Sequence, residues 1–180
     1  MKGKLALEDI KQEVASIAGE YFRKGLNCAE SVYQALQKVG LVDFPPDTVA
    51  MTTAFGGGIG LSGGVCGALV ALTMAVSAVH GRKYPCAEEN LDVIDQLYGD
   101  SGLYRFFNQI PTAFVQRFGS TDCRQLTQDY GEWFHRERYL KCRAIVMESA
   151  IMAVDFIVLG PKEGYGQPSG ENMAGKSTAK

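Results

Sequence analysis

The residues of this chain best suited to chemistry are its five cysteines: Cys28, Cys66, Cys86, Cys123 and Cys142. A thiolate is both a nucleophile and a ligand for soft metals. An odd number of cysteines argues against a framework of structural disulfides and favours catalytic or metal-binding roles. The alternative is that the cysteines only pack, because free cysteine is among the most often buried residue types.

Three of the cysteines are predicted to lie in the first turn of a helix. The segments Asn27–Glu30 and Asp122–Gln125 each place a capping residue directly before a cysteine and a Glu or Gln three residues after the cap, as in a capping box. Cys66 follows a glycine-rich run and opens an apolar segment. Unpaired amides and the helix dipole stabilise a thiolate in this position, so we expect lowered pKa values for Cys28, Cys66 and Cys123.

The other two cysteines lack this local pattern. Cys142 falls on the apolar face of the last expected helix, where Arg138, one turn earlier, can face it. Cys86 follows Pro85 in an expected loop, and we interpret it as incidental. The chain has no CxxC pair and no CxxCH motif, so a thioredoxin-type site, a zinc ribbon and covalent c-type haem are not indicated.

The densest run of glycines, residues 55–64, lies directly before Cys66. Residues 58–63 match the string GxGxxG, but a helix is expected before them and no βαβ unit surrounds them, so nucleotide binding is not indicated. Glycines let backbone segments approach closely, and exposed amides in such a loop can hold an anion or the sulfurs of a cluster. We expect five glycines to play this cofactor-binding part: Gly57, Gly58, Gly60, Gly64 and Gly67.

Helices must position these residues, because apolar side chains recur at spacings of three and four almost throughout and no strand pair is indicated. A kink or a fresh start is expected at Pro111, and the last long helix should stop at Gly160 and Pro161. The predicted fold class is all-α: a single-domain helical bundle over residues 5–160, with a glycine-rich loop carrying the central cysteine. Residues 161–180 have few apolar side chains and are expected to form a flexible C-terminal tail.

Composition excludes several function classes. The formal net charge is −2 and the sequence pI is about 5.7, with no basic patch, so we expect no nucleic-acid partner. The apolar stretches Val65–Val79 and Ala144–Leu159 are shorter than the ~20 residues that cross a bilayer, so no membrane span is expected. No secretory signal is recognisable in Met1–Lys11, and we expect a cytoplasmic protein. Several helices have wide apolar faces, which favours a homodimer.

The segment from Phe55 to Gly60, together with Gly64-Val65-Cys66-Gly67-Ala68, resembles the central signature of the C-GCAxxG-C-C family of redox-active proteins. Members of this family place one cysteine early, one in the signature and two late, and four cysteines here match that order: Cys28, Cys66, Cys123 and Cys142. The resemblance spans about Leu5 to Gly160. The signature's closing glycine is Ala71 in this chain, a departure small enough to preserve close packing.

The resemblance implies cysteine redox chemistry or a cysteine-held metal centre, and it makes Cys142 a site residue. A related domain occurs in split-Soret cytochromes, where an iron–sulfur centre has been suggested. The first hypothesis is therefore an electron-transfer or sensor protein in which all four cysteines hold a 2Fe–2S cluster, or else one thiolate-bound metal ion. The scattered positions of the ligands differ from common cluster motifs. The redox partner protein is not identified.

Two alternatives remain open at this point. One is a thiol–disulfide redox protein without metal or other cofactor, in which Cys66 attacks and Cys28 or Cys123 resolves. This alternative requires two Cα atoms within about 7 Å of each other. The other is a helical interaction module whose cysteines only pack.

Overall fold

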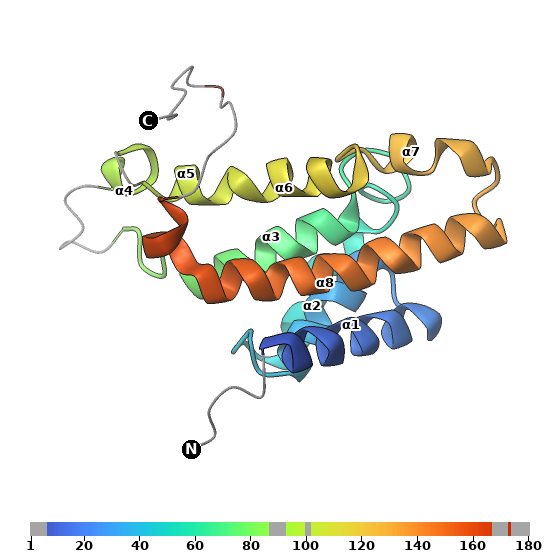
Figure 1. The fold of residues 1–180 in the computed structure, drawn as a ribbon, viewed down its shortest axis with the longest axis horizontal. Coiled ribbons are helices and arrows are strands. Elements are labelled where there is room, and N and C mark those ends of the chain that lie inside the picture. The colour runs from blue at the N-terminus through green and yellow to red at the C-terminus, as the bar shows by residue number, and fades with distance from the viewer. Residues whose placement is uncertain (1–6, 87–92, 100–101, 167–172, 174–180) are drawn as a thin grey trace.

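The computed structural model describes residues 7–86, 93–99, 102–166 and 173. These residues form α-helices and short 3-10 helices joined by loops (Figure 1). The elements in chain order are α1 (Leu7–Arg23), α2 (Cys28–Lys38), η1 (Pro46–Phe55), α3 (Gly67–His80), α4 (Asp95–Tyr98), α5 (Leu103–Phe107), α6 (Gln109–Phe118), α7 (Cys123–Leu126), η2 (Gln128–Tyr130) and α8 (Arg136–Gly164). No strand occurs in the described part of the chain, so the predicted all-α fold is confirmed.

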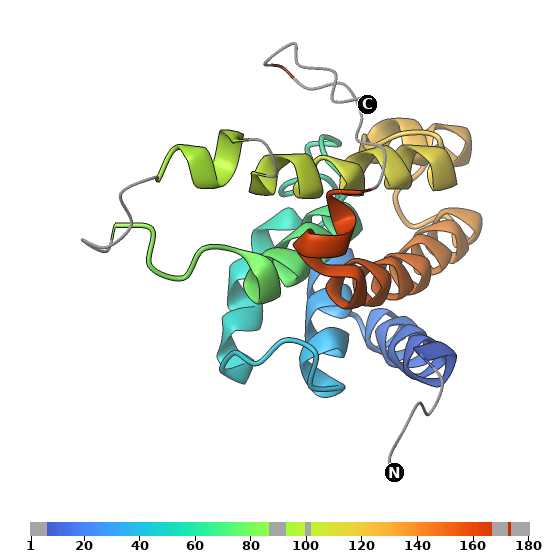
Figure 2. The same cartoon turned by 60° about the vertical axis from the view of Figure 1, so that its left-hand side comes forward.

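Helix α8 runs through the middle of the bundle and packs against α1, α2 and α3. Figures 1 and 2 show α1 beside α8 on one side of the molecule and the α5–α6 segment on the other. Helix α3 is buried along most of its length, and its small residues Ala68, Ala71 and Ala75 are fully buried, which lets neighbouring helices approach it closely. Lys11 of α1 pairs with Asp155 of α8 at 2.6 Å across the surface.

Three helix boundaries can be compared with the expected elements. The short helix that the sequence predicts from Asp47 to about Phe55 is present as the 3-10 helix η1. The sequence also predicts a helix over 87–98; its last part is present as α4, Asp95–Tyr98, and residues 87–92 lie outside the described part. The fresh start near Pro111 is confirmed: α5 ends at Phe107, and Pro111 occupies the first turn of α6, where its missing N–H costs no helical hydrogen bond.

The expected break at Gly160 is present, and a short further helical segment follows it. Gly160 has a φ of 65°, and helical structure resumes at Pro161 and continues to Gly164. Gly164 is buried against the ring of Phe106, and its carbonyl accepts a hydrogen bond of 2.8 Å from Gln109 Nε2. The predicted end of the regular helix at Gly160 is therefore confirmed, and the additional helical turn after it, which was not predicted, is held in place by these contacts. Most of the predicted tail over 161–180 lies outside the described residues, and the domain limits 5–160 stay a prediction.

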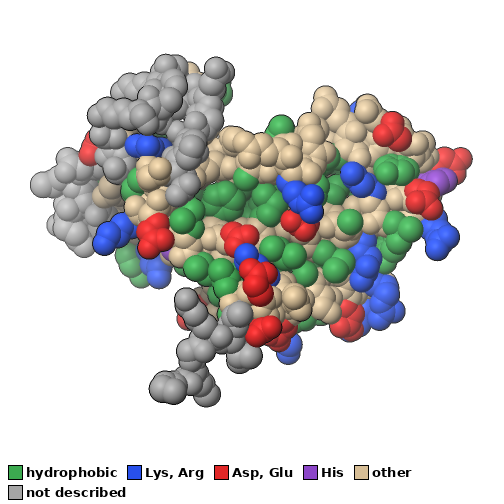
Figure 3. Space-filling view, in the orientation of Figure 1, with side chains coloured by type: hydrophobic (Ala, Val, Ile, Leu, Met, Phe, Trp, Pro, Cys, Tyr) green, Lys and Arg blue, Asp and Glu red, His purple; other side chains and the backbone are tan. Residues whose placement is uncertain are grey.

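The surface carries charges of both signs. On the face shown in Figure 3, acidic and basic side chains are interspersed. None of the helices in the described ranges has the length and apolar character that a bilayer crossing requires.

Candidate functional site

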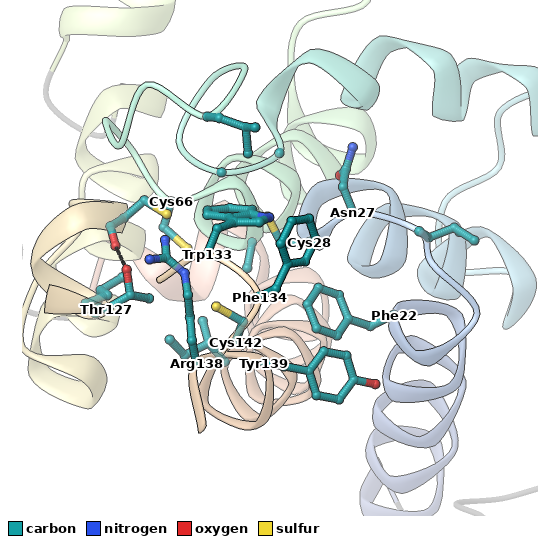
Figure 4. Close-up of a pocket in the computed structure, with 18 of the residues that line it drawn as sticks. Phe22, Asn27, Cys28, Cys66, Thr127, Trp133, Phe134, Arg138, Tyr139 and Cys142 are labelled. Carbon is teal, nitrogen blue, oxygen red and sulfur yellow. Dashed lines mark hydrogen bonds between the residues drawn. The ribbon is translucent and has the colours of Figure 1, made fainter. Parts of the chain in front are cut away.

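A cavity of about 730 Å³ opens at the end of the bundle where α2, α3, α7 and α8 begin. Four cysteines line it: Cys28, Cys66, Cys123 and Cys142. Figure 4 shows the labelled Cys28, Cys66 and Cys142 side chains arranged around this one space. All five cysteines of the chain are unpaired, and Cys86 is exposed and does not line the cavity. The structure thus brings together the four cysteines that the sequence singled out and leaves the fifth aside.

Cys28 is placed by the capping box predicted from the sequence. Asn27 Oδ1 accepts hydrogen bonds from the amides of Ala29 and Glu30, at 2.9 and 3.0 Å, and Glu30 Oε2 accepts one of 2.9 Å from the Asn27 amide. Asn27 Nδ2 also donates to the Thr53 carbonyl at 2.9 Å, which ties the start of α2 to η1. Cys28 is therefore the first residue of a firmly capped helix.

Cys66 and Cys123 are held side by side by backbone hydrogen bonds. The Cys66 amide donates to the Thr121 carbonyl at 2.8 Å, and the Cys123 amide donates to the Gly64 carbonyl at 2.7 Å. Val65 and Asp122 form an isolated antiparallel bridge between these bonds. This bridge joins the glycine-rich loop to α7. Because it links segments far apart in the chain, no local pattern could have predicted it.

The glycine-rich loop turns through a run of left-handed residues. Residues 57 to 61 all have positive φ, including the non-glycine residues Ile59 and Leu61 at 66° and 67°. The Gly60 amide donates to the Ala54 carbonyl of η1 at 2.8 Å, and the Gly64 amide donates to the Gly58 carbonyl within the loop at 3.1 Å.

The predicted close approach of backbone occurs at two other glycines. A Cβ atom on Gly58 would lie 2.8 Å from Cys123 Cβ, and one on Gly67 would lie 2.6 Å from Cys28 Sγ. The amides of Gly57 and Gly67 favour the Cys28 thiolate. The loop therefore positions two of the cysteines by its lack of side chains.

Burial dominates the acidity of the four thiols. It raises the pKa of Cys66 to about 12, and the neighbouring Cys28 adds to the rise, whereas the amides of Ala68 and Leu69 lower it. Burial also raises the pKa of Cys28 and of Cys123. The expected lowering of these pKa values is therefore wrong: the first-turn amides are present, but loss of hydration outweighs them.

Cys142 behaves in the same way. Burial raises its pKa to about 11, and the neighbouring Cys123 and Cys28 add to the effect. Arg138 opposes the rise at both Cys142 and Cys123, and it also hydrogen-bonds the Cys123 sulfur. The predicted proximity of Arg138 to Cys142 is confirmed, and its contact with Cys123 was not foreseen.

Aromatic rings form a part of the cavity that sequence reasoning missed. Phe22, Trp133, Phe134 and Tyr139 line it together. The Phe22 and Tyr139 rings stack with centroids 5.3 Å apart, and the Arg138 guanidinium lies 4.3 Å from the centre of the Trp133 ring. One signal for them was available, since Trp133-Phe134 stands in a charged stretch with no apolar periodicity to explain it.

Among the described residues, no group of three or more His, Cys, Asp or Glu side chains is arranged to hold a metal ion.

The comparisons with known proteins agree with this arrangement. A family model described as "Putative redox-active protein (C_GCAxxG_C_C)" matches residues 26–156, a range that includes the glycine-rich loop and all four cavity cysteines. No curated protein and no solved structure matched the chain.

Proposed function

Because the chain belongs to the C_GCAxxG_C_C family of redox-active proteins, we propose that its four clustered cysteines hold an iron–sulfur cluster and that the protein transfers or senses electrons. The observation that carries this proposal is the meeting of four cysteines, from four separate elements, in one cavity. When bound, such a cluster supplies one-electron chemistry at a potential set by its charge, its hydrogen bonds and its exposure.

The lack of a compact group of ligand side chains among the described residues favours a cluster over a single ion. A single tetrahedral ion needs every ligand sulfur about 2.3 Å from the metal, which requires the sulfurs to be tightly grouped. Thiolates that hold a cluster of several metal atoms lie further apart, and a cavity of about 730 Å³ has room for one. A 2Fe–2S cluster would take one thiolate from each of the four positions: Cys28, Cys66, Cys123 and Cys142. A single thiolate-bound metal is the less favoured form of the same proposal.

The surrounding groups would support thiolates there. Arg138 places a positive charge beside Cys123 and Cys142, and the amides of Gly57 and Gly67 face Cys28. Since burial raises the pKa of all four thiols, they carry protons in the metal-free protein, and ligation must release these protons.

The test is an absorption spectrum of protein purified without oxygen, with iron and labile sulfide measured on the same sample. We expect a brown protein with sulfur-to-iron charge-transfer bands. The colour should be lost in Cys66→Ser and kept in Cys86→Ser, the matched control outside the cavity. A colourless protein that takes up neither iron nor sulfide after anaerobic reconstitution would overturn the proposal.

One observation favours the metal-free alternative, a thiol–disulfide redox protein. Cys28 Sγ lies against Gly67, the residue next to Cys66. After burial, repulsion from the Cys28 thiolate is the largest effect that raises the pKa of Cys66. Cys66 would attack and Cys28, or Cys123, would resolve. The raised pKa of Cys66 works against this role, because the thiolate is the attacking form.

A mass-spectrometric map of mildly oxidised protein separates the two functions. A reversible Cys28–Cys66 disulfide in a protein that binds no iron would favour the metal-free alternative. The third hypothesis, an interaction module with packing cysteines, requires that replacing all four by serine changes neither metal content nor redox behaviour.

A further inference from the structure

The cavity is larger than the cysteines require. At about 730 Å³ it falls within the ~300–1,000 Å³ typical of pockets for small organic molecules. Its lining has two unlike parts. One part carries the four cysteines, and the other, which we call the aromatic wall, consists of Phe22, Trp133, Phe134 and Tyr139. No cysteine belongs to the aromatic wall.

The aromatic wall presents apolar ring surface to solvent. Phe134 is 95% exposed and Trp133 is 42% exposed, although both line the cavity. Exposed aromatic rings grouped around a cavity are typical of a ligand site, because covering them with a ligand is favourable. Figure 4 shows Trp133 and Phe134 projecting over the same space as the Phe22 and Tyr139 rings.

The Trp133 ring is held in position before any ligand arrives. Arg138 lies 4.3 Å from its centre, and a Cβ atom on Gly57 would meet the edge of the indole at 2.8 Å. A ring fixed in this way loses little conformational freedom when a second flat ring packs against it.

The charge of the lining has one sign. Arg136 and Arg138 are the charged side chains among the described residues that line the cavity, and no Asp or Glu lines it. Arg136 is exposed and Arg138 is half-buried. The guanidinium group suits phosphate and carboxylate oxygens, because its planar donors match their geometry.

We propose that the aromatic wall binds a flat aromatic molecule that carries a phosphate or other anionic group. The ring system packs on Trp133 and Phe134, and the anion lies at Arg136 and Arg138. This goes beyond the iron–sulfur proposal and does not depend on it, because binding uses none of the four cysteines. The ligand would lie next to the cysteines, within the same cavity.

The chain itself supplies the reporter for a test, because Trp133 is its only tryptophan. The probes are flavin mononucleotide and riboflavin, which share one ring system and differ in the phosphate. Both are titrated into the colourless protein and into protein loaded with iron and sulfide, and the quenching of Trp133 fluorescence is corrected for flavin absorbance. We expect saturable quenching by both probes, with tighter binding of flavin mononucleotide, in both preparations.

Two substitutions of exposed residues test the contacts without disturbing the fold. Phe134→Ala should weaken the binding of both flavins roughly three- to tenfold, as expected for the loss of one ring contact. Arg136→Gln should weaken flavin mononucleotide roughly threefold and leave riboflavin unchanged. Phe44→Ala and Arg117→Gln, exposed residues outside the cavity, should leave both affinities unchanged.

The outcomes separate this inference from the iron–sulfur proposal. Saturable flavin binding by a protein that never takes up iron supports the proposed ligand site at the aromatic wall. The failure to take up iron then counts only against the iron–sulfur proposal. No saturable quenching by either flavin up to millimolar concentration would overturn the inference. Equal weakening by Phe134→Ala and Phe44→Ala would overturn it as well, and equal affinity for the two flavins would overturn the role of the arginines.

Discussion

At the scale of single residues, Gly67 shows how little space separates the elements of the site. A Cβ atom there would lie 2.5 Å from the Phe55 carbonyl oxygen and 2.6 Å from Cys28 Sγ. Neither the backbone of η1 nor the first residue of a capped helix can yield easily. The glycine in the Cys-Gly-Ala part of the signature is thus explained sterically, because Cys28 occupies the space that a side chain at position 67 would need.

We therefore expect Gly67→Ala to lower the free energy of unfolding by about 1–3 kcal/mol, the usual cost of an overpacked site. It should also displace Cys28 and reduce the iron bound after reconstitution. The matched control is Gly64→Ala, since a Cβ atom on Gly64 would meet its nearest atoms at 3.5 and 3.7 Å, an ordinary contact. Urea denaturation and iron analysis measure the two effects. Equal behaviour of the two variants would contradict the steric argument.

At the scale of elements, the start of α2 joins three parts of the molecule. The Asn27 side chain caps α2, its Nδ2 holds the Thr53 carbonyl of η1, and Gly56 of the glycine-rich loop lies against it. The cap therefore stabilises α2 and also fixes the position of Cys28 relative to the glycine-rich loop.

Asn27→Ala should lower the free energy of unfolding by about 1–2 kcal/mol, because it removes both cap hydrogen bonds and the bond to Thr53. Asn27→Asp keeps the cap acceptor and loses only the donor to Thr53, so its loss should be smaller. The midpoint of urea denaturation measures both variants. If the aspartate variant were as unstable as the alanine variant, the bond to Thr53 rather than the cap would carry the stability.

At the scale of the whole molecule, buried thiols link stability to pH. The pKa of Cys66 is raised from 9.0 to about 12 and that of Cys142 from 9.0 to about 11, mainly by burial. Folding therefore favours the protonated thiols. The contribution of these two thiols to the free energy of unfolding is complete below pH 9, where the thiols are protonated in both the folded and the unfolded protein. It is lost as the pH rises above 9, because the thiols of the unfolded chain ionise first.

We expect the metal-free protein to lose stability steadily between pH 9 and pH 12. Lys11 and Tyr165 also have raised pKa values, so variants are needed to isolate the thiols. The fall in the free energy of unfolding with pH should be shallower in Cys142→Ala. It should be unchanged in Cys86→Ala, because the Cys86 side chain is exposed. Denaturant titrations at a series of pH values measure this. An equally steep fall in Cys142→Ala would show that its thiol is not buried as described.

Oligomeric state, a redox partner protein and location are also whole-molecule properties. The homodimer and the cytoplasmic location expected from the sequence stay predictions, and light scattering on the purified protein tests the first.

The sequence by itself determined what depends on neighbouring residues. Helices followed from apolar spacing, the caps at Asn27 and Asp122 from residue types at fixed offsets, and the family from the residues around Cys66. Tertiary structure decided the rest. The raised thiol pKa values, the bridge between Val65 and Asp122 and the aromatic wall each arise from segments distant in the chain. Burial and electrostatic environment sum over all neighbours in space, so no local pattern can specify them.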